Sequence, residues 1–349
     1  MLFRRARRPR REIDNVQFDL SGDQRELAAA ARDLLDGHAS SERVRKVLNT
    51  GIDAELWAAM VEQGWPVVAL AEDAGGLGLS WVEACVLAEQ VGYHVAPAPF
   101  AGAVLATRAL AAAGHALLEP VAAGDKVASV VWAGGLAIDA PGADLLVHVT
   151  TDGVTLHEVT DRPAATAAMD VTRQVTRIDW STVGAGTALG GGDLATDLLD
   201  AGATLYAAEL LGVAQRVLDM SVEYAGVREQ FGKPIGSFQA VKHRCADMLV
   251  DVEGIRSASW YASWAVATSA PDVSLAASTA KAWASDAAPR VTTSGLQVHG
   301  GIGFTWEHDL HLYLKRAQLS SVVFGDATWH RERLAALLKD RVEAGQPVF

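Results

Sequence analysis

Long amphipathic segments in the second half of the chain place the strongest constraint on its fold. Apolar residues recur there at helical spacing. The patterns cover residues 193–227, 237–268, 271–294, 307–317 and 326–343. The connections between them are short, so consecutive helices are expected to run antiparallel and to pack side by side. Residues 193–349 are therefore predicted to form a C-terminal four-helix bundle.

The first half of the chain divides into a helical part and a β-rich part. Residues 19–125 carry helical patterns, and two of them begin at serines that can cap a helix, Ser21 and Ser80. Residues 126–192 change to short runs rich in β-branched residues, separated by Gly, Pro and Asp turns. Those runs are 127–132, 145–150, 154–157 and 173–179. The predicted fold is mainly α, with a small β domain between two helical regions.

Charge and composition narrow the class of protein. The 349 residues carry a net charge of −12, which argues against a general nucleic-acid binder. Residues 1–18 break this trend with Arg4, Arg5, Arg7, Arg8, Arg10 and Arg11. Such a tail could contact nucleic acid or acidic lipid, but a basic, disordered arm is the expected state.

The hydropathy pattern and the cysteines disfavour a membrane-spanning protein, a disulfide-rich protein and a thiolate metal site. No run of about 18 apolar residues occurs, so no membrane-spanning helix is expected. The two cysteines, Cys85 and Cys245, lie far apart on helical patterns and indicate neither a disulfide framework nor a thiolate metal site. A reducing, cytoplasmic location is therefore expected.

The connection between the first two long helices is chemically unusual. Residues 228–239 read Arg-Glu-Gln-Phe-Gly-Lys-Pro-Ile-Gly-Ser-Phe-Gln. Gly232 and Pro234 stop one helix before the next begins. The planar guanidinium of Arg228 could pair with two phosphate oxygens at once. An ordinary helix–helix turn with polar surface residues explains the stretch equally well.

A second unusual stretch follows the third long helix. Residues 297–303 read Gln-Val-His-Gly-Gly-Ile-Gly. Three glycines in four positions allow the backbone to approach a ligand closely, and their N–H groups can hold a phosphate. A helix C-cap followed by a bend is the alternative. Two such sites in one bundle make a phosphate-bearing ligand the better interpretation.

Together these stretches resemble the acyl-CoA dehydrogenase family, the flavoenzymes that oxidise acyl-CoA thioesters to enoyl-CoA. The resemblance covers nearly the whole chain, and residues 228–239 are its most specific part. Its other motifs are Trp57, Gly64-Trp65, Glu72, Gly75-Gly76-Leu77-Gly78, Glu89, Gly92, Pro97, Pro99-Phe100, Gln297, Gly300-Gly301, Gly303, Trp306-Glu307, His311-Leu312-Tyr313 and Arg316-Ala317.

The resemblance implies FAD as the cofactor and assigns residues to it. Those residues are Arg228, Gln230, Phe231, Gln239, Gln297, Gly300, Gly301 and Thr328. It places Arg228 at the pyrophosphate, and Gln297 with the two glycines at the pyrophosphate of an FAD bound largely by a neighbouring subunit. It also implies an acyl-CoA substrate, an electron-transfer flavoprotein or similar electron acceptor, and a homo- or hetero-oligomer that can include a paralogous subunit.

The catalytic base departs from the family pattern. Most members use a glutamate in a Glu-Gly-Thr turn, whereas residues 324–328 here read Phe-Gly-Asp-Ala-Thr, with Asp326 at the glutamate position. An aspartate carboxylate retreats by roughly 1–1.5 Å, because it is one methylene shorter. A misplacement of about 1 Å can cost about a hundredfold in rate. Asp326 is therefore either a repositioned base or only the N-cap of the last helix.

Two further departures from the family pattern concern the catalytic base and the cover of the flavin ring. Some members carry the base on the first long bundle helix, where this chain has Gly202, and neither Asp200 nor Glu209 is a strong substitute. Residues 126–190 also lack the Thr-Glu-Pro-x-x-Gly-Ser-Asp-like loop that covers the flavin ring in the family.

Three hypotheses follow from these departures. The chain is an active dehydrogenase that uses Asp326; or a non-catalytic subunit that completes an FAD site in an α2β2 heteromer with a full-length paralogue; or a flavin-free helical scaffold. The second type of assembly resembles actinobacterial enzymes for bulky CoA thioesters, including steroid side chains.

Overall fold

The computed structural model describes residues 19–347, so the predicted arm at residues 1–18 lies outside the described residues. The N-terminal region is helical, and capping boxes at Ser21 and Ser80 confirm both predicted helix starts. Its helices are α1 (Gly22–His38), α2 (Ser41–Lys46), α3 (Ala54–Glu62), α4 (Trp81–Tyr93), α5 (Phe100–Ala112) and α6 (Leu118–Ala122).

A small β domain follows the helical region, as predicted. Its strands are β1 (Ala128–Trp132), β2 (Leu136–Ile138), β3 (Leu145–Val149), β4 (Gly153–Glu158), β5 (Val175–Arg177) and β6 (Thr187–Gly191). The main sheet has the order β1-β3-β4-β6, with β1 parallel to β3 and the other pairs antiparallel; β2 pairs separately with β5. The prediction missed β2, which has only three residues, and β6, which contains two glycines.

The link between β1 and β2 has only three residues, 133–135. The N–H of Gly135 donates to the carbonyl of Trp132 at 3.1 Å, which closes this link into a tight turn. No cover loop is therefore inserted between these strands, in agreement with the missing loop noted in the sequence.

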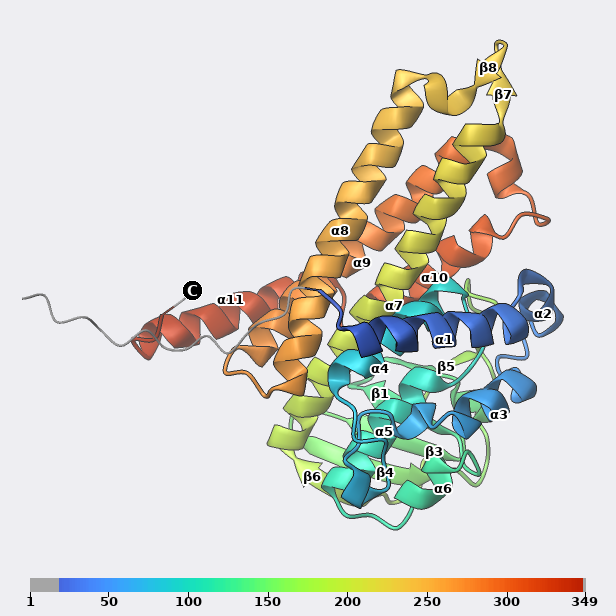
Figure 1. Ribbon diagram of the computed structural model, residues 1–349. Coiled ribbons are helices and arrows are strands. Elements are labelled where there is room, and N and C mark those ends of the chain that lie inside the picture. The colour runs from blue at the N-terminus through green and yellow to red at the C-terminus, as the bar shows by residue number, and fades with distance from the viewer. Residues whose placement is uncertain (1–18, 348–349) are drawn as a thin grey trace, which may run out of the picture.

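The C-terminal region is a bundle of long helices (Figure 1). Its helices are α7 (Gly192–Val227), α8 (Gln239–Ala267), α9 (Val273–His299), α10 (Leu310–Val322) and α11 (Ala327–Glu343). Helix α9 packs against each of the other four, and α11 projects away from the body of the molecule in Figure 1. The sequence pattern predicted that this helix ends at Ser294, but α9 continues for five more residues to His299.

Residues 228–239 form more than a simple helix–helix turn. Two short strands, β7 (Glu229–Gln230) and β8 (Lys233–Pro234), pair as an antiparallel hairpin. Phe231 and Gly232 at its tip both have positive φ, 54° and 74°, as the mirror-image turns of tight hairpins require. The hairpin is labelled at the upper end of the bundle in Figure 1.

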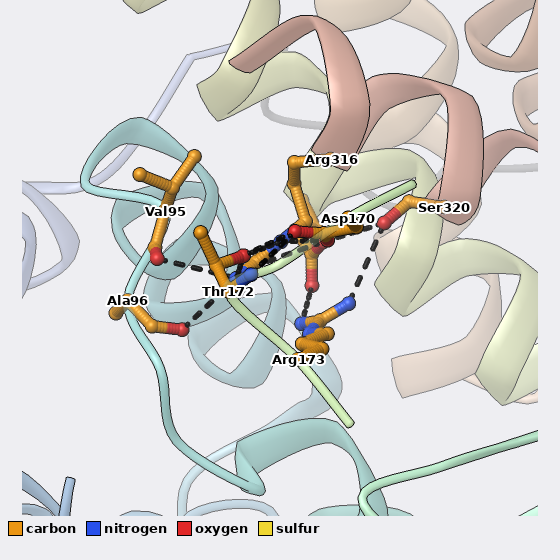
Figure 2. Close-up of polar contacts among 8 residues, drawn as sticks. Val95, Ala96, Asp170, Thr172, Arg173, Arg316 and Ser320 are labelled. Carbon is orange, nitrogen blue, oxygen red and sulfur yellow. Dashed lines mark hydrogen bonds and ion pairs between the residues drawn. The ribbon is translucent and has the colours of Figure 1, made fainter. Parts of the chain in front are cut away.

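A buried ionic network joins the β domain to the bundle (Figure 2). Arg316 on α10 donates from Nε to Asp170 Oδ2 at 3.0 Å and from Nη2 to Thr172 Oγ1 at 2.6 Å. Arg173 donates from Nη2 to Glu209 Oε2 on α7 at 2.5 Å. Asp170, Thr172 and Arg173 belong to the segment between β4 and β5, so charged groups fix this segment on the bundle.

Among residues 19–347, no helix is both long enough and apolar enough to cross a membrane.

Candidate flavin-binding site

Arg228 lies at the C-terminal end of α7, where the hairpin begins. Its N–H donates to the carbonyl of Tyr224 at 2.9 Å, and its carbonyl accepts the N–H of Ile235 at 2.7 Å. The backbone is therefore anchored, whereas the guanidinium is exposed and has no hydrogen bond or ion pair with any residue of the described range 19–347. A permanent cation without an internal partner is available to an external anion.

The hairpin also presents polar and aromatic side chains to solvent. Phe231 is 92% exposed and meets Phe238 edge-on at 6.0 Å between ring centroids. Gln230 donates from Nε2 to the carbonyl of Glu229 at 2.8 Å, and Gln239 is exposed at the first residue of α8. An exposed ring of this kind can stack on an aromatic ligand.

The glycine loop follows the end of α9. Gly300 has φ 63° and ψ −140°, and a Cβ atom added to Gly300 or Gly301 would meet nothing within 4 Å. No neighbouring atom therefore covers the Cα of either glycine, while the N–H of Gly300 itself donates to the carbonyl of Leu296. The side chain of Gln297 is exposed one turn earlier, and Phe304 and Trp306 nearby are 64% and 55% exposed.

The fold brings the hairpin and the glycine loop to the same end of the bundle. The ring of Tyr224, one turn before Arg228, stacks on the ring of His299, which precedes Gly300. A Cβ added to Gly295 on α9 would collide with Val217 on α7, so the two helices are in close contact here. An unpaired guanidinium, an uncovered glycine backbone and exposed rings together fit a pyrophosphate joined to an aromatic group.

Asp326 and Thr328 lie elsewhere. Asp326 is exposed and caps α11, since its Oδ1 accepts the N–H of Trp329 at 2.8 Å. The preceding carbonyl, that of Gly325, accepts a hydrogen bond from Lys281 on α9. The helical rise from Lys281 to His299 on α9 is about 27 Å. The predicted site residues therefore form two groups, and the fold keeps Asp326 and Thr328 apart from the other seven.

Aromatic side chains pack around the turn that carries Asp326. Phe324 is 3% exposed and stacks on Tyr206 of α7, with 5.7 Å between ring centroids. A Cβ added to Gly202 would collide with the ring of Phe324. Trp329 on α11 meets Trp132, the last residue of β1, edge-on at 5.9 Å. The space next to Gly202 is thus filled by the Phe324 ring.

The two other acidic residues considered as a base are held in ion pairs. Glu209 is 2% exposed and accepts from Arg173 and from Ser320. Asp200 accepts from Arg333 Nη1 at 2.5 Å and from Ser274 Oγ at 2.5 Å. Their carboxylate oxygens are committed to these partners, in agreement with the prediction that neither replaces the missing glutamate.

Sequence reasoning missed Lys281, which holds the Asp326 turn from inside. This fully buried side chain donates from Nζ to Ser285 Oγ at 2.9 Å, to the carbonyl of Ser321 at 2.9 Å and to that of Gly325 at 2.8 Å. Burial away from water lowers the pKa of Lys281 to about 7. The available signal was a lone lysine on the apolar face of an alanine-rich helix.

The lowered pKa predicts how stability depends on pH. Between about pH 7 and the ordinary lysine pKa of about 10.4, the unfolded chain binds a proton at Lys281 that the folded chain has released. The free energy of unfolding should therefore gain a contribution from Lys281 that rises with pH across this window. Urea unfolding at pH 6.5 and pH 9 should show that Lys281→Met removes this rise. Replacing the exposed Lys242 in the same way is the control, and an unchanged rise in Lys281→Met would contradict the assignment.

Comparison with known proteins identifies the family. The N-terminal domain of acyl-CoA dehydrogenases matches residues 21–119, and their C-terminal domain matches residues 190–339. The chain therefore belongs to the acyl-CoA dehydrogenase family, as the sequence motifs indicated. FAD is the cofactor of this class, and the open, cationic end of the bundle fits its pyrophosphate.

The relatives include mycobacterial proteins and two-component assemblies. The chain is 39% identical over 319 residues to the acyl-CoA dehydrogenase IpdE2 of Mycolicibacterium smegmatis, covering 89% of this chain and 96% of that protein. A chain of the ChsE4–ChsE5 complex from Mycobacterium tuberculosis is 27% identical, with a TM-score of 0.82 over 93% of this chain and 99% of that one. A chain of the Tcur3481–Tcur3483 steroid ACAD is 30% identical, with a TM-score of 0.80 over 92% and 99%.

Proposed function

We propose that this chain completes the FAD site of a heteromeric acyl-CoA dehydrogenase, whose reaction is the α,β-dehydrogenation of an acyl-CoA thioester to enoyl-CoA. Arg228, Gln297 and the Gly300–Gly301 backbone hold the pyrophosphate, while Gln230, Phe231 and Gln239 adjoin the adenosine part. A paralogous partner chain surrounds the flavin ring of this FAD and supplies the catalytic base. When bound, FAD supplies the acceptor for the hydride from the β-carbon.

The observation that carries this proposal is the separation of the two groups of site residues. The ribityl chain between pyrophosphate and flavin ring has five carbons and spans roughly 10 Å at ordinary bond lengths. It cannot bridge the helical rise of about 27 Å between the glycine loop and the level of Lys281 on α9. A cofactor held by Arg228 therefore presents its ring to another chain, which is a second copy of this chain in the active alternative and a paralogue in the proposed assembly.

The surroundings of the Asp326 turn support a base supplied by the partner. The three-residue link after β1 provides no cover for a flavin ring. The carboxylate of Asp326 is engaged in capping α11, and Phe324 covers Gly202. The active alternative, with Asp326 as base, draws on the exposure of this carboxylate and on Thr328 in the same turn. The scaffold alternative leaves the unpaired Arg228 without a purpose.

The substrate class and partners are inferred from the similar assemblies. Two of the similar solved structures are two-component complexes, and one of them is described as a steroid ACAD. A bulky or sterol-derived acyl-CoA is therefore the proposed substrate, and a paralogous subunit the proposed partner. An electron-transfer flavoprotein or similar acceptor takes the electrons.

Expression of the chain alone and together with a paralogue tests the proposal. We expect no flavin absorbance for the lone chain, and one FAD per two chains with acyl-CoA oxidation for the pair. Asp326→Asn in this chain should leave turnover of the pair unchanged. Flavin with turnover in the lone chain, abolished by Asp326→Asn, would establish the active alternative. Absence of flavin in every combination would leave the scaffold.

A further inference from the structure

We propose that Tyr224 and His299 are positioning residues. Their stacked rings hold the two FAD-binding segments of this chain at a fixed distance and orientation. Tyr224 lies one helical turn before Arg228, and its carbonyl accepts the N–H of Arg228 at 2.9 Å. His299 lies between Gln297 and Gly300 in the chain. The two ring centroids are 4.6 Å apart, with 19° between the ring planes. The stack thus connects the root of the hairpin directly to the root of the glycine loop.

The His299 ring is fixed from several sides. Its Nδ1 donates to the carbonyl of Gly295 one turn earlier at 2.9 Å, and the side chain is 4% exposed. The ring of His308 meets it edge-on at 4.8 Å. A Cβ added to Gly303 would lie 3.0 Å from the His299 Cβ, so the loop closes tightly over this residue. The His299 ring is therefore rigidly held, and the Tyr224 ring that stacks on it fixes the position of the C-terminal end of α7.

The hairpin needs such an anchor because it has few others. Apart from its own strand pairing, its base is held by the Ile235 N–H, which donates to the Arg228 carbonyl, and by Gly236, where an added Cβ would lie 2.8 Å from the Ala225 carbonyl oxygen. The remaining residues of the tip are exposed. A ligand that has to order a loop loses affinity, and a preset loop avoids this cost.

A first experiment needs no cofactor. Hydrogen exchange of the full chain reports on the amides of Arg228 and Ile235, which are both hydrogen-bonded. Loss of an aromatic pair is expected to speed their exchange by about tenfold in His299→Leu. The matched control is Tyr261→Leu, which removes the Tyr261–Trp264 stack far from both segments. Unchanged exchange at Arg228 and Ile235 in His299→Leu would overturn the proposal.

A second experiment measures FAD affinity and rests on the proposed function. In the flavin-binding assembly, Tyr224→Leu and His299→Leu should each weaken FAD binding by about tenfold. The double variant should bind about as weakly as either single variant, because both remove one interaction. Tyr224→Phe and His299→Phe retain the stack and should stay within about twofold of the native chain.

The outcomes separate this inference from the proposed function. A double variant about a hundredfold weaker, or a His299→Phe variant as weak as His299→Leu, would overturn the role of the stack. Absence of flavin in every assembly of the native chain would contradict the proposed function instead, and the exchange experiment would then decide the inference.

Discussion

Replacement of Arg228 by alanine is expected to weaken FAD binding by about a hundredfold. Two charge-assisted hydrogen bonds from one guanidinium contribute about 1.5 kcal/mol each, and 1.4 kcal/mol is a tenfold change in affinity. The measurement is a fluorescence titration of the flavin-binding assembly with FAD. Arg228→Lys should recover only part of the affinity, since an ammonium keeps the charge but not the planar fork.

The same substitution should leave folding unaffected, which makes the test specific. The Arg228 side chain has no hydrogen-bond or ion-pair partner within residues 19–347, so its removal leaves no group uncompensated. The melting temperature of the chain should therefore stay within error. Arg177→Ala, which removes another exposed arginine from the β domain, is the control for lost positive charge. Native FAD affinity in Arg228→Ala would refute the phosphate-binding role.

Replacement of Arg316 by methionine is expected to lower the free energy of unfolding by about 3–5 kcal/mol. Arg316 is fully buried, and it also donates from Nη2 to the carbonyl of Val95 at 3.2 Å (Figure 2). Its loss leaves the carboxylate of Asp170 buried without a cation and removes the ion pair with Glu209, at 3.7 Å from Nη1. Urea unfolding of the lone chain measures the change.

A surface ion pair provides the comparison for Arg316. Arg331 pairs with Asp286, but both side chains are substantially exposed, so Arg331→Met should cost less than about 1 kcal/mol. Arg316→Lys should not restore stability, because one ammonium cannot reach Asp170, Thr172 and the Val95 carbonyl together. A loss below about 1 kcal/mol in Arg316→Met would show that the network does not hold the β domain on the bundle.

Local patterns in the sequence predicted most of the fold. The long helices α7, α8 and α9 carry continuous apolar periodicity, and the capping boxes at Ser21 and Ser80 are local interactions that sequence spacing defines. The prediction failed where the local signal is weak, as at β2 with three residues, or where a turn closes within four residues, as in the hairpin at Phe231 and Gly232.

The candidate site residues could be named from the sequence, but their arrangement could not. Arg228, Gln297, Gly300 and Gly301 were candidates, because the chemistry that could bind phosphate is visible in the residue types. That Tyr224 stacks on His299, or that Lys281 lies under the Asp326 turn, involves contacts between segments far apart in the chain. Periodicity contains no information on which face of one helix meets which face of another.

The sequence by itself determined the family, the three-part helical and β architecture and the cofactor class, and it supplied the candidates for phosphate binding. Only the tertiary structure decided that these residues gather at one end of α9 while Asp326 caps a helix at the other. The physical reason is that helix formation and residue chemistry are local properties, whereas the distance between two sites depends on how rigid helices pack. That packing separates Arg228 from Asp326, and the proposal that the base comes from a partner chain rests on this separation.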